Sequence, residues 1–149
     1  VPIHVSEQSG DSRRVIDVHL RQRCNRLVEI SAELLVKDLA AFVDKAEKES
    51  SKEGFDLKNY PELSPKELQN VSALSFKQLT VNWQLLRSAL SLYIGVSETE
   101  QILLTPIRHR VSDVWGRVHG WTRDRFDQEG NAIAALPALA HIHVLINKP

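Results

Sequence analysis

The chain has 149 residues, and its 19 basic and 19 acidic side chains give a formal net charge of zero. This balance removes the overall positive field that draws proteins onto nucleic acid, so no nucleic-acid partner is expected. A domain of this size buries a sizeable core without disulfides, and the single cysteine, Cys24, suits a reducing compartment. No apolar run approaches the roughly 20 residues of a membrane span, which predicts a soluble protein. A first residue of Val1 and the absence of methionine indicate a fragment of a longer protein.

The first part of the chain predicts a leader followed by one long helix. Residues 1–11 have no lasting periodicity and are expected to form a flexible leader. From residue 12 to about residue 48, apolar residues recur with the period of a helix in two adjoining stripes. At 1.5 Å per residue this helix would be about 55 Å long, which predicts a rod-like bundle. One stripe contains Leu20, Cys24, Leu27, Ser31 and Leu34, and the other contains Val28, Ala32, Leu35, Leu39, Phe42 and Ala46.

A charged loop separates this helix from the next. Residues 49–63 alternate charges around Gly54 and Pro61, which predicts a solvated loop that could be disordered. The sequence Ser64-Pro65-Lys66-Glu67 then predicts a helix start. Ser64 is the expected N-cap, and Glu67 is placed to return a hydrogen bond to the cap.

The second helix is expected to end at a glycine. Its apolar pattern runs to Ile94, and Gly95 is a natural C-terminal stop. The pattern leaves two choices for the buried face, because either residue of each of two pairs fits the period. These pairs are Leu74 with Ser75 and Leu85 with Leu86.

The third helix is predicted to begin with a second capping box and to contain a proline. Ser97 and Glu100 repeat the capping-box chemistry, and the acids complement the positive end of the helix dipole. Pro106 cannot donate a hydrogen bond to the carbonyl of Ile102, so the helix either kinks there or ends at Thr105. Beyond the proline, one core stripe is predicted at Ile107, Val111, Val114, Val118 and Trp121.

The pattern as a whole predicts an all-α fold. Residues 128–131 contain Gly130 and form the next expected turn, and residues 137–146 are expected to form a short closing helix after Pro137. The expected architecture is an elongated antiparallel helical bundle of about four to five helices, two of them long. Residues 12–149 then form a single domain.

The sequence predicts no catalytic, metal or cofactor site. His141 and His143 would point about 200° apart on a helix, so they cannot share one ion. Cys24 and His19 lie about 140° apart around the first helix, which is poor geometry for an activated thiol. Glycine-rich phosphate loops are also missing from the sequence. We therefore expect a protein that is not an enzyme and that needs no cofactor.

Basic residues near the start of the first helix are one candidate interaction site. They could bind anionic lipid head groups or nucleic acid. The alternative is an ordinary solvated face, which the lack of interleaved aromatic residues favours. These basic residues are Arg13, Arg14, Arg21, Arg23 and Arg26.

Further candidates lie in the third helix. Trp115 could be an interface anchor or a core residue, because aromatic residues serve both roles. Gly116 and Gly120 each cost about 1 kcal/mol relative to alanine within a helix. That cost suggests close approach by another helix, or an earlier helix end. Arg108 joins the candidate interaction residues without an assigned role.

The chain resembles the family of third subunits of the conserved oligomeric Golgi complex, a vesicle tether, in their C-terminal region. Ser91-Leu92-Tyr93, Thr99-Glu100, Ile102-Leu103 and Pro106-Ile107-Arg108 carry the resemblance, followed by His119 and Phe126. The first helix adds Asp17, His19-Leu20, Cys24, Leu39, Phe42 and Lys45. The chain departs from the family pattern at Gly116, Gly120 and Leu136, and the loop at residues 49–63 aligns poorly.

The resemblance implies a function. It implies a non-catalytic, all-helical scaffold subunit on the cytosolic face of Golgi membranes, which it would contact peripherally. Such a subunit would bind sister subunits and help hold vesicles in retrograde intra-Golgi transport. Membrane-fusion proteins, small GTPases and coiled-coil tethers would be further partners. The alternative is a helical module that binds anionic lipid or nucleic acid through the basic start of the first helix.

Overall fold

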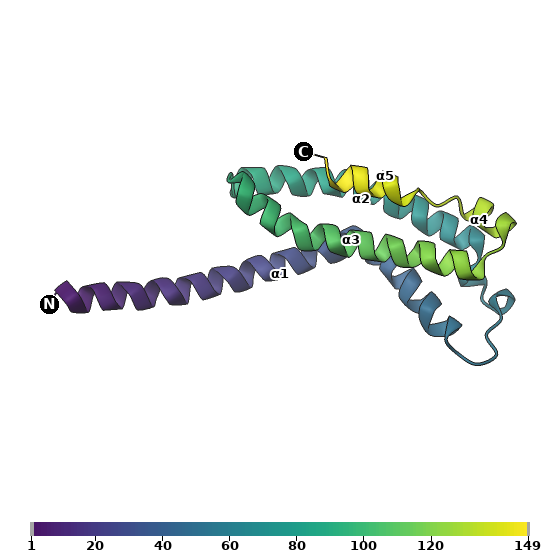
Figure 1. Ribbon diagram of the computed structural model, residues 1–149, viewed down its shortest axis with the longest axis horizontal. Coiled ribbons are helices and arrows are strands. Elements are labelled where there is room, and N and C mark those ends of the chain that lie inside the picture. The colour runs from purple at the N-terminus through teal and green to yellow at the C-terminus, as the bar shows by residue number, and fades with distance from the viewer. Residues whose placement is uncertain (1, 149) are drawn as a thin grey trace.

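The computed structural model describes the backbone of residues 2–148, and the side chains from residue 21 onward together with those of Val15, Val18 and His19. Over these residues the fold is all-α, as predicted (Figure 1). The α-helices are α1 (Pro2–Ser50), α2 (Pro65–Tyr93), α3 (Ser97–Arg125), α4 (Gln128–Ala134) and α5 (Leu139–Ile146). Two short 3-10 turns, η1 (Leu57–Asn59) and η2 (Pro61–Leu63), lie between α1 and α2.

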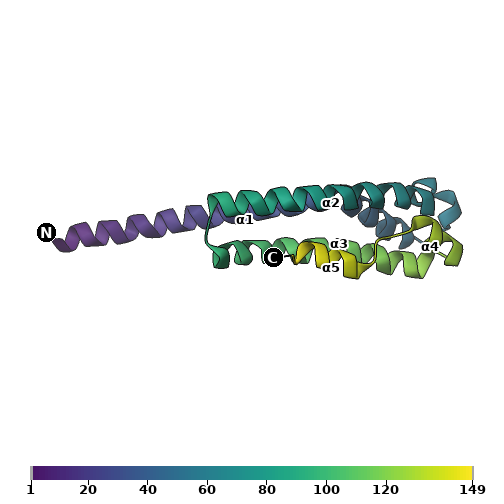
Figure 2. The same ribbon diagram turned by 90° about the horizontal axis from the view of Figure 1, so that it is seen from above.

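The three long helices form the body of an elongated bundle. α1 packs on both α2 and α3, while α4 packs on α2 and α5 packs on α3. Figures 1 and 2 show α2 running antiparallel to α1 and α3, and they show the N-terminal part of α1 extending beyond the other helices. The expectation of two long helices was wrong, because α3 continues through its proline and is as long as α2, at 29 residues.

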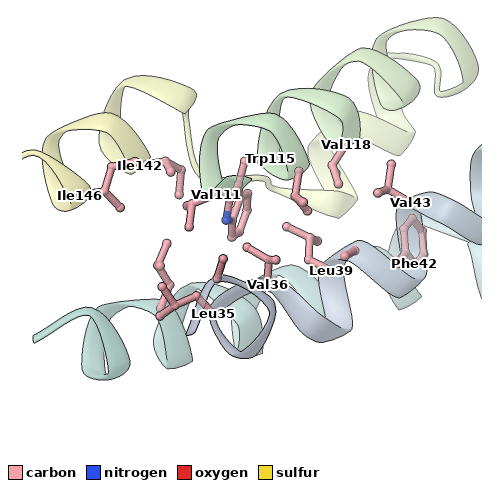
Figure 3. Packing of buried hydrophobic residues seen from close by; sticks show 14 of the residues in the cluster. Leu35, Val36, Leu39, Phe42, Val43, Val111, Trp115, Val118, Ile142 and Ile146 are labelled. Atoms are coloured by element: carbon pink, nitrogen blue, oxygen red, sulfur yellow. The ribbon is translucent and has the colours of Figure 1, made fainter. Parts of the chain in front are cut away.

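The core lies among α1, α2, α3 and α5, and Figure 3 shows part of it from close by. Val36 and Leu39 of α1 point toward Val111 and Trp115 of α3, and all four side chains are at most 1% exposed. The stripe predicted for the third helix is confirmed, since each of its members is buried. Burial of this apolar surface is the main stabilising contribution to the fold.

Of the two stripes predicted for the first helix, one lies in the core. Leu35 and Leu39 of the second stripe are buried, whereas Leu27 and Leu34 of the first stripe are 53% and 64% exposed. The physical reason is that α2 and α3 cover one side of α1. α1 begins at Pro2, within the stretch for which a flexible leader is predicted, and the flexibility of residues 1–11 stays a prediction.

The segment between α1 and α2 has more structure than the sequence suggested. Asp56 accepts a hydrogen bond from the N–H of Lys58 and caps η1. The rings of Phe55 and Tyr60 stack at 5.1 Å, and Leu63 is 1% exposed. The apolar residues among the charges thus anchor this loop to the bundle.

The start and end of α2 follow the sequence closely. Ser64 Oγ accepts a hydrogen bond of 3.3 Å from the N–H of Glu67, and Pro65 is the first helical residue. The Ser64 N–H donates to the carbonyl of Pro61 at 3.2 Å. The return hydrogen bond from this N–H to the Glu67 carboxylate, which the sequence predicted, is therefore replaced by a backbone bond. At the other end, Gly95 has a φ of 69°, which suits the residue after a helix stop.

The start of α3 differs from the predicted capping box. Val96 is the N-cap, and its backbone carbonyl accepts the first helical hydrogen bond from the N–H of Glu100 at 3.0 Å. Ser97 is therefore the first helical residue, and its expected role as a side-chain cap was wrong. Glu98 and Glu100 still lie in the first turn, where negative charge is favourable.

Pro106 lies inside a continuous helix. α3 runs through it, which excludes a helix end at Thr105. Figure 1 shows the first turns of α3 inclined to the remainder of the helix. Thr105 Oγ1 donates to the carbonyl of Gln101 at 2.9 Å and supports the turn before the proline.

One stretch could cross a membrane by length and composition alone, contrary to the expectation from the sequence. Gln128–Ile146 has 19 residues and a mean hydropathy of 1.3. In the structure it is not one helix, because Ala135 adopts a left-handed φ of 48° and α5 begins only at Leu139. Such a break would leave backbone groups unsatisfied in lipid. Ile142 and Ile146 are instead fully buried within the protein.

Candidate functional site

The described side chains do not gather into a metal site. Among them, no three His, Cys, Asp or Glu residues could hold one metal ion. His141 and His143 are both exposed on α5. The Nε2 atom of His119 lies 2.8 Å from the carbonyl oxygen of Pro137, so this ring ties α3 to the segment before α5.

Ion pairs within the fold shift the pKa values of Glu49 and Arg117. The pKa of Glu49 is lowered by the hydrogen bond of 2.7 Å that it accepts from Lys52. The pKa of Arg117 is raised because it donates to Glu47 and Asp44. These charges are neutralised by their partners, so neither is set up to move a proton for a substrate.

Ion pairs fix the register of α1 against α3. Arg117 Nη2 donates to Asp44 Oδ1 at 2.6 Å, and its Nε atom donates to Glu47 Oε1 at 2.8 Å. About two turns earlier in α3, Arg110 Nε donates to Glu33 Oε1 at 2.9 Å. Because the partners are half-exposed or exposed, these pairs position the two helices more than they stabilise them.

The basic residues at the start of α1 do not share one face. Arg21, Arg23 and Arg26 are all exposed. At about 100° per residue, Arg23 points roughly 160° away from Arg21 and roughly 60° away from Arg26. A flat anionic surface could therefore reach only part of this set. The side chains of Arg13 and Arg14 lie outside the described residues.

Arg108 has a structural role that the sequence did not show. Its Nε atom donates to the carbonyl oxygen of Ile146 at 2.7 Å, and its Nη1 atom donates to Gln101 Oε1 at 2.9 Å. The guanidinium lies 5.8 Å from the ring centre of Trp83. Burial and the nearby charge of Arg87 lower the pKa of Arg108. Arg108 thus holds the end of α5 and is not a freely presented interaction residue.

Trp115 is a core residue, which corrects its place among the candidate interaction residues. Its side chain is 1% exposed, and its ring packs edge-on against Phe76 at 6.4 Å. Trp121 is 6% exposed and donates through Nε1 to Ser50 Oγ at 2.8 Å. Neither ring can anchor a partner on the surface of this chain.

The two glycines of α3 do not mark a close helix contact within the described residues. A Cβ atom at Gly116 would meet nothing within 4 Å, and one at Gly120 would meet only the flexible end of Arg123 at 3.8 Å. The helix also continues to Arg125. Neither of the two explanations suggested by the sequence therefore holds in this chain.

The turn between α2 and α3 is the most exposed apolar part of the described structure. We call Leu92, Tyr93, Val96 and Ile102 the α2–α3 corner; their exposed fractions are 78%, 84%, 55% and 70%. The corner belongs to the segment that carries the family resemblance. The apolar pattern of the second helix runs through Tyr93, yet this side chain is exposed in the structure.

Other large apolar side chains are exposed on α1 and α2. Their fractions range from 49% to 64%. A shallow groove between the two helices is lined by Leu34 and Leu35 of α1 and by Leu86 of α2. The features that favour an interaction surface are thus apolar and lie on helices. One sign of this surface was present in the sequence: at residues 74–75 and 85–86, either residue of each pair could have been the buried one. The exposed apolar residues on α1 and α2, besides those of the corner, are Val15, Val18, Leu27, Ile30, Leu34, Leu74, Val81 and Leu85.

Comparison with known proteins agrees with the resemblance seen in the sequence. The chain is 25% identical over 147 residues to human conserved oligomeric Golgi complex subunit 3 and 24% identical over 148 residues to the mouse protein. The Drosophila melanogaster subunit is 21% identical over 157 residues. These matches cover 95–96% of the chain and 17–18% of each relative. The chain therefore spans less than a fifth of the length of these relatives.

Two further comparisons found nothing. No protein-family model matches the chain, and no solved structure matches it. Over nearly all of its length, the chain is similar to the C-terminal region of subunit 3 of the conserved oligomeric Golgi complex.

Proposed function

We propose that the chain is part of a scaffold subunit of a Golgi tethering complex and acts by binding the sister subunits. The observation that carries this proposal is its similarity to the third subunit of the conserved oligomeric Golgi complex over 95–96% of its length. The relatives that carry this subunit name come from mammals and insects, so the similarity extends across distant organisms.

The structure supports a role in assembly. Three long helices packed side by side make an elongated body, and such a body places separate binding surfaces far apart. Exposed apolar residues at the α2–α3 corner are a common feature of protein interfaces. In α3, Arg110 and Arg117 form ion pairs with α1, and Arg108 donates to the end of α5. A non-catalytic function agrees with this arrangement.

The proposal extends to the location, the transport step and the further partners that the family resemblance implies. The subunit would act peripherally at the cytosolic face of Golgi membranes, in retrograde intra-Golgi transport. Membrane-fusion proteins, small GTPases and coiled-coil tethers would be its further partners. In this mechanism the chain does no chemistry, because its contribution is to bridge other proteins.

Affinity purification tests the proposal. A tagged copy of the chain is expressed in cells of its own organism, and the co-purifying proteins are identified by mass spectrometry. We expect sister subunits of the tethering complex at near-equal amounts. A folded chain that retains none of them would overturn the proposal. A variant with Arg21, Arg23 and Arg26 all changed to alanine is the matched control and should retain the same proteins.

A further inference from the structure

α2 has two apolar faces, of which the bundle uses only one. Leu68, Leu79 and Trp83 face inward and are fully buried. A second set faces solvent on the opposite side of the helix. We call this set the outer α2 seam; it consists of Leu74, Val81, Leu85 and Leu92, which are 50%, 54%, 62% and 78% exposed.

The outer α2 seam has the spacing of a helix-packing interface. Its members are separated by seven, four and seven residues. At about 100° per residue they fall within roughly 40° of one line, which extends about 27 Å along the helix axis. Apolar residues at this spacing form the a and d positions of coiled coils. A straight, narrow seam of this kind accepts one helix alongside it.

The chemistry around the seam also differs from that of an ordinary solvated face. Charged residues make up 26% of the whole chain. Between Leu68 and Tyr93, however, the sequence contains only Lys77 and Arg87, and the single acid of α2, Glu67, lies in its first turn. Depletion of charge is the compositional mark of the central part of protein interfaces.

The charges that remain indicate the sign of the partner. Lys77 is exposed and lies one turn from both Leu74 and Val81, so it flanks the seam. Arg87 lies about 140° around the helix from the seam and donates to the carbonyl oxygen of Lys148, so Lys77 is the charged residue of α2 that flanks the seam. An acidic residue beside the seam of a partner helix would complement Lys77. A second copy of α2 would bring only the same cation to the interface.

We propose that the outer α2 seam is the docking site for one amphipathic helix of a partner protein, with apolar residues at heptad spacing and acidic residues beside them. The inference rests on the proposed function in one respect, since it takes the chain to be a subunit of a larger assembly. The seam reaches Leu92, so it is continuous with the α2–α3 corner, and the two form one extended apolar surface.

Binding of designed peptides to the 149-residue chain tests this site. The acidic probe is a helical peptide of about four heptads with leucine at a and d and glutamate at e and g. The matched basic probe has lysine at e and g. Like charges at these positions keep each peptide from pairing with itself. Dissociation constants are measured by fluorescence anisotropy at low and at high salt.

We expect the acidic peptide to bind about tenfold or more tightly than the basic peptide, and its advantage should shrink at high salt. The double variant Val81→Gln/Leu85→Gln should lose this binding. Because both side chains are more than half exposed, the variant should stay folded, which circular dichroism verifies. The matched control is Ile30→Gln/Leu34→Gln, which removes exposed apolar residues of α1 and should bind as the parent chain does. Lys77→Glu should reduce the preference for the acidic peptide.

Several results would overturn the proposal. These are failure of the acidic peptide to bind, equal binding of both peptides, or equal loss of binding in the α1 control. Self-association of the chain that Val81→Gln/Leu85→Gln abolishes would assign the seam to a second copy. Binding of neutral lipid vesicles that the same variant abolishes would assign it to a membrane.

The test also separates this inference from the proposed function. If sister subunits co-purify equally with the parent chain and with Val81→Gln/Leu85→Gln, the seam inference fails and the scaffold function stands. If no sister subunit co-purifies with either chain, the scaffold function fails. Seam-dependent peptide binding would in that case still identify a helix-docking surface.

Discussion

Arg108 Nε donates a hydrogen bond of 2.7 Å to the backbone carbonyl oxygen of Ile146, a residue 38 positions further along the chain. The bond satisfies a carbonyl at the end of α5, where the helix itself supplies no donor. It joins the first half of α3 to the last helix. Arg108 is the last residue of the Pro106-Ile107-Arg108 motif that carries part of the resemblance, and the structure gives it a physical purpose.

Replacing Arg108 with alanine should destabilise the fold. The variant loses a charged hydrogen bond and the contact with Trp83, which together are worth about 2 kcal/mol. Urea denaturation measures the loss, and hydrogen exchange should show faster opening of α5. Arg123→Ala, at an exposed position of the same helix, serves as control and should change stability little. Equal effects of the two substitutions would contradict the assigned role.

Val114→Asp should prevent folding. Val114 is 0% exposed, and a carboxylate there would be buried without a partner. The cost of several kcal/mol is comparable to the whole stability of a small domain. Circular dichroism checks this outcome. Val144→Asp places the same charge at a position that is 62% exposed, and that variant should fold. A stable, folded Val114→Asp variant would show that the core of α3 is misassigned.

Pro106→Ala should stabilise the chain. α3 already passes through this position, and an alanine N–H could reach the carbonyl of Ile102. Pro106 is exposed, so little packing is lost. The gain could reach about 3 kcal/mol, the usual cost of proline within a helix. Thermal denaturation measures it. A lowered melting temperature would show that the inclination of the first turns of α3 is needed for packing.

Substitution of glycines should separate open from crowded positions. Gly116→Ala should raise stability by about 1 kcal/mol, because a Cβ atom there meets nothing within 4 Å. Gly130→Ala should lower it by about 1 kcal/mol or more, since the Cβ atom would lie 3.1 Å from Asp127 Oδ1 and 3.3 Å from Pro65 Cγ. Urea denaturation of both variants gives the sign. Destabilisation by Gly116→Ala would refute the open surroundings of this residue.

The two predicted capping serines should behave differently. Ser64→Ala should cost about 1 kcal/mol, because Ser64 Oγ accepts the hydrogen bond from the N–H of Glu67. Ser97→Ala should stay within about 0.5 kcal/mol of the parent chain, because Val96 and not Ser97 is the N-cap. Chemical denaturation of both variants measures these costs. Similar costs for the two would restore the capping box that the sequence suggested.

Local signals in the sequence predicted the fold well. Ser64 and Gly95 mark where α2 begins and ends, because capping and left-handed backbone depend on adjacent residues. The apolar stripe of α3 predicted the buried face of this helix, because its helical period fits only one set of residues. Where the period allows two residues, as at Leu74 and Ser75, only the packed structure decides: Ser75 is 4% exposed and Leu74 is 50% exposed.

The interaction surface could not be predicted from the sequence in the same way. Whether an apolar residue lies in the core or faces solvent depends on which neighbours cover it. Leu34 and Leu35 are adjacent, yet they are 64% and 5% exposed. The contact of Arg108 with Ile146 joins distant parts of the chain, and no local pattern encodes it. The proposed function rests on the resemblance to a family, because the local chemistry of the chain alone did not indicate one.

Reconstitution from purified proteins tests the central claim most directly. The chain is mixed with each purified sister subunit of the tethering complex from its own organism, and binding is measured by size-exclusion chromatography with light scattering. The account predicts a stable one-to-one complex with at least one sister subunit. Folded chain that elutes separately from every sister subunit, under conditions in which the full-length third subunit binds, would contradict it.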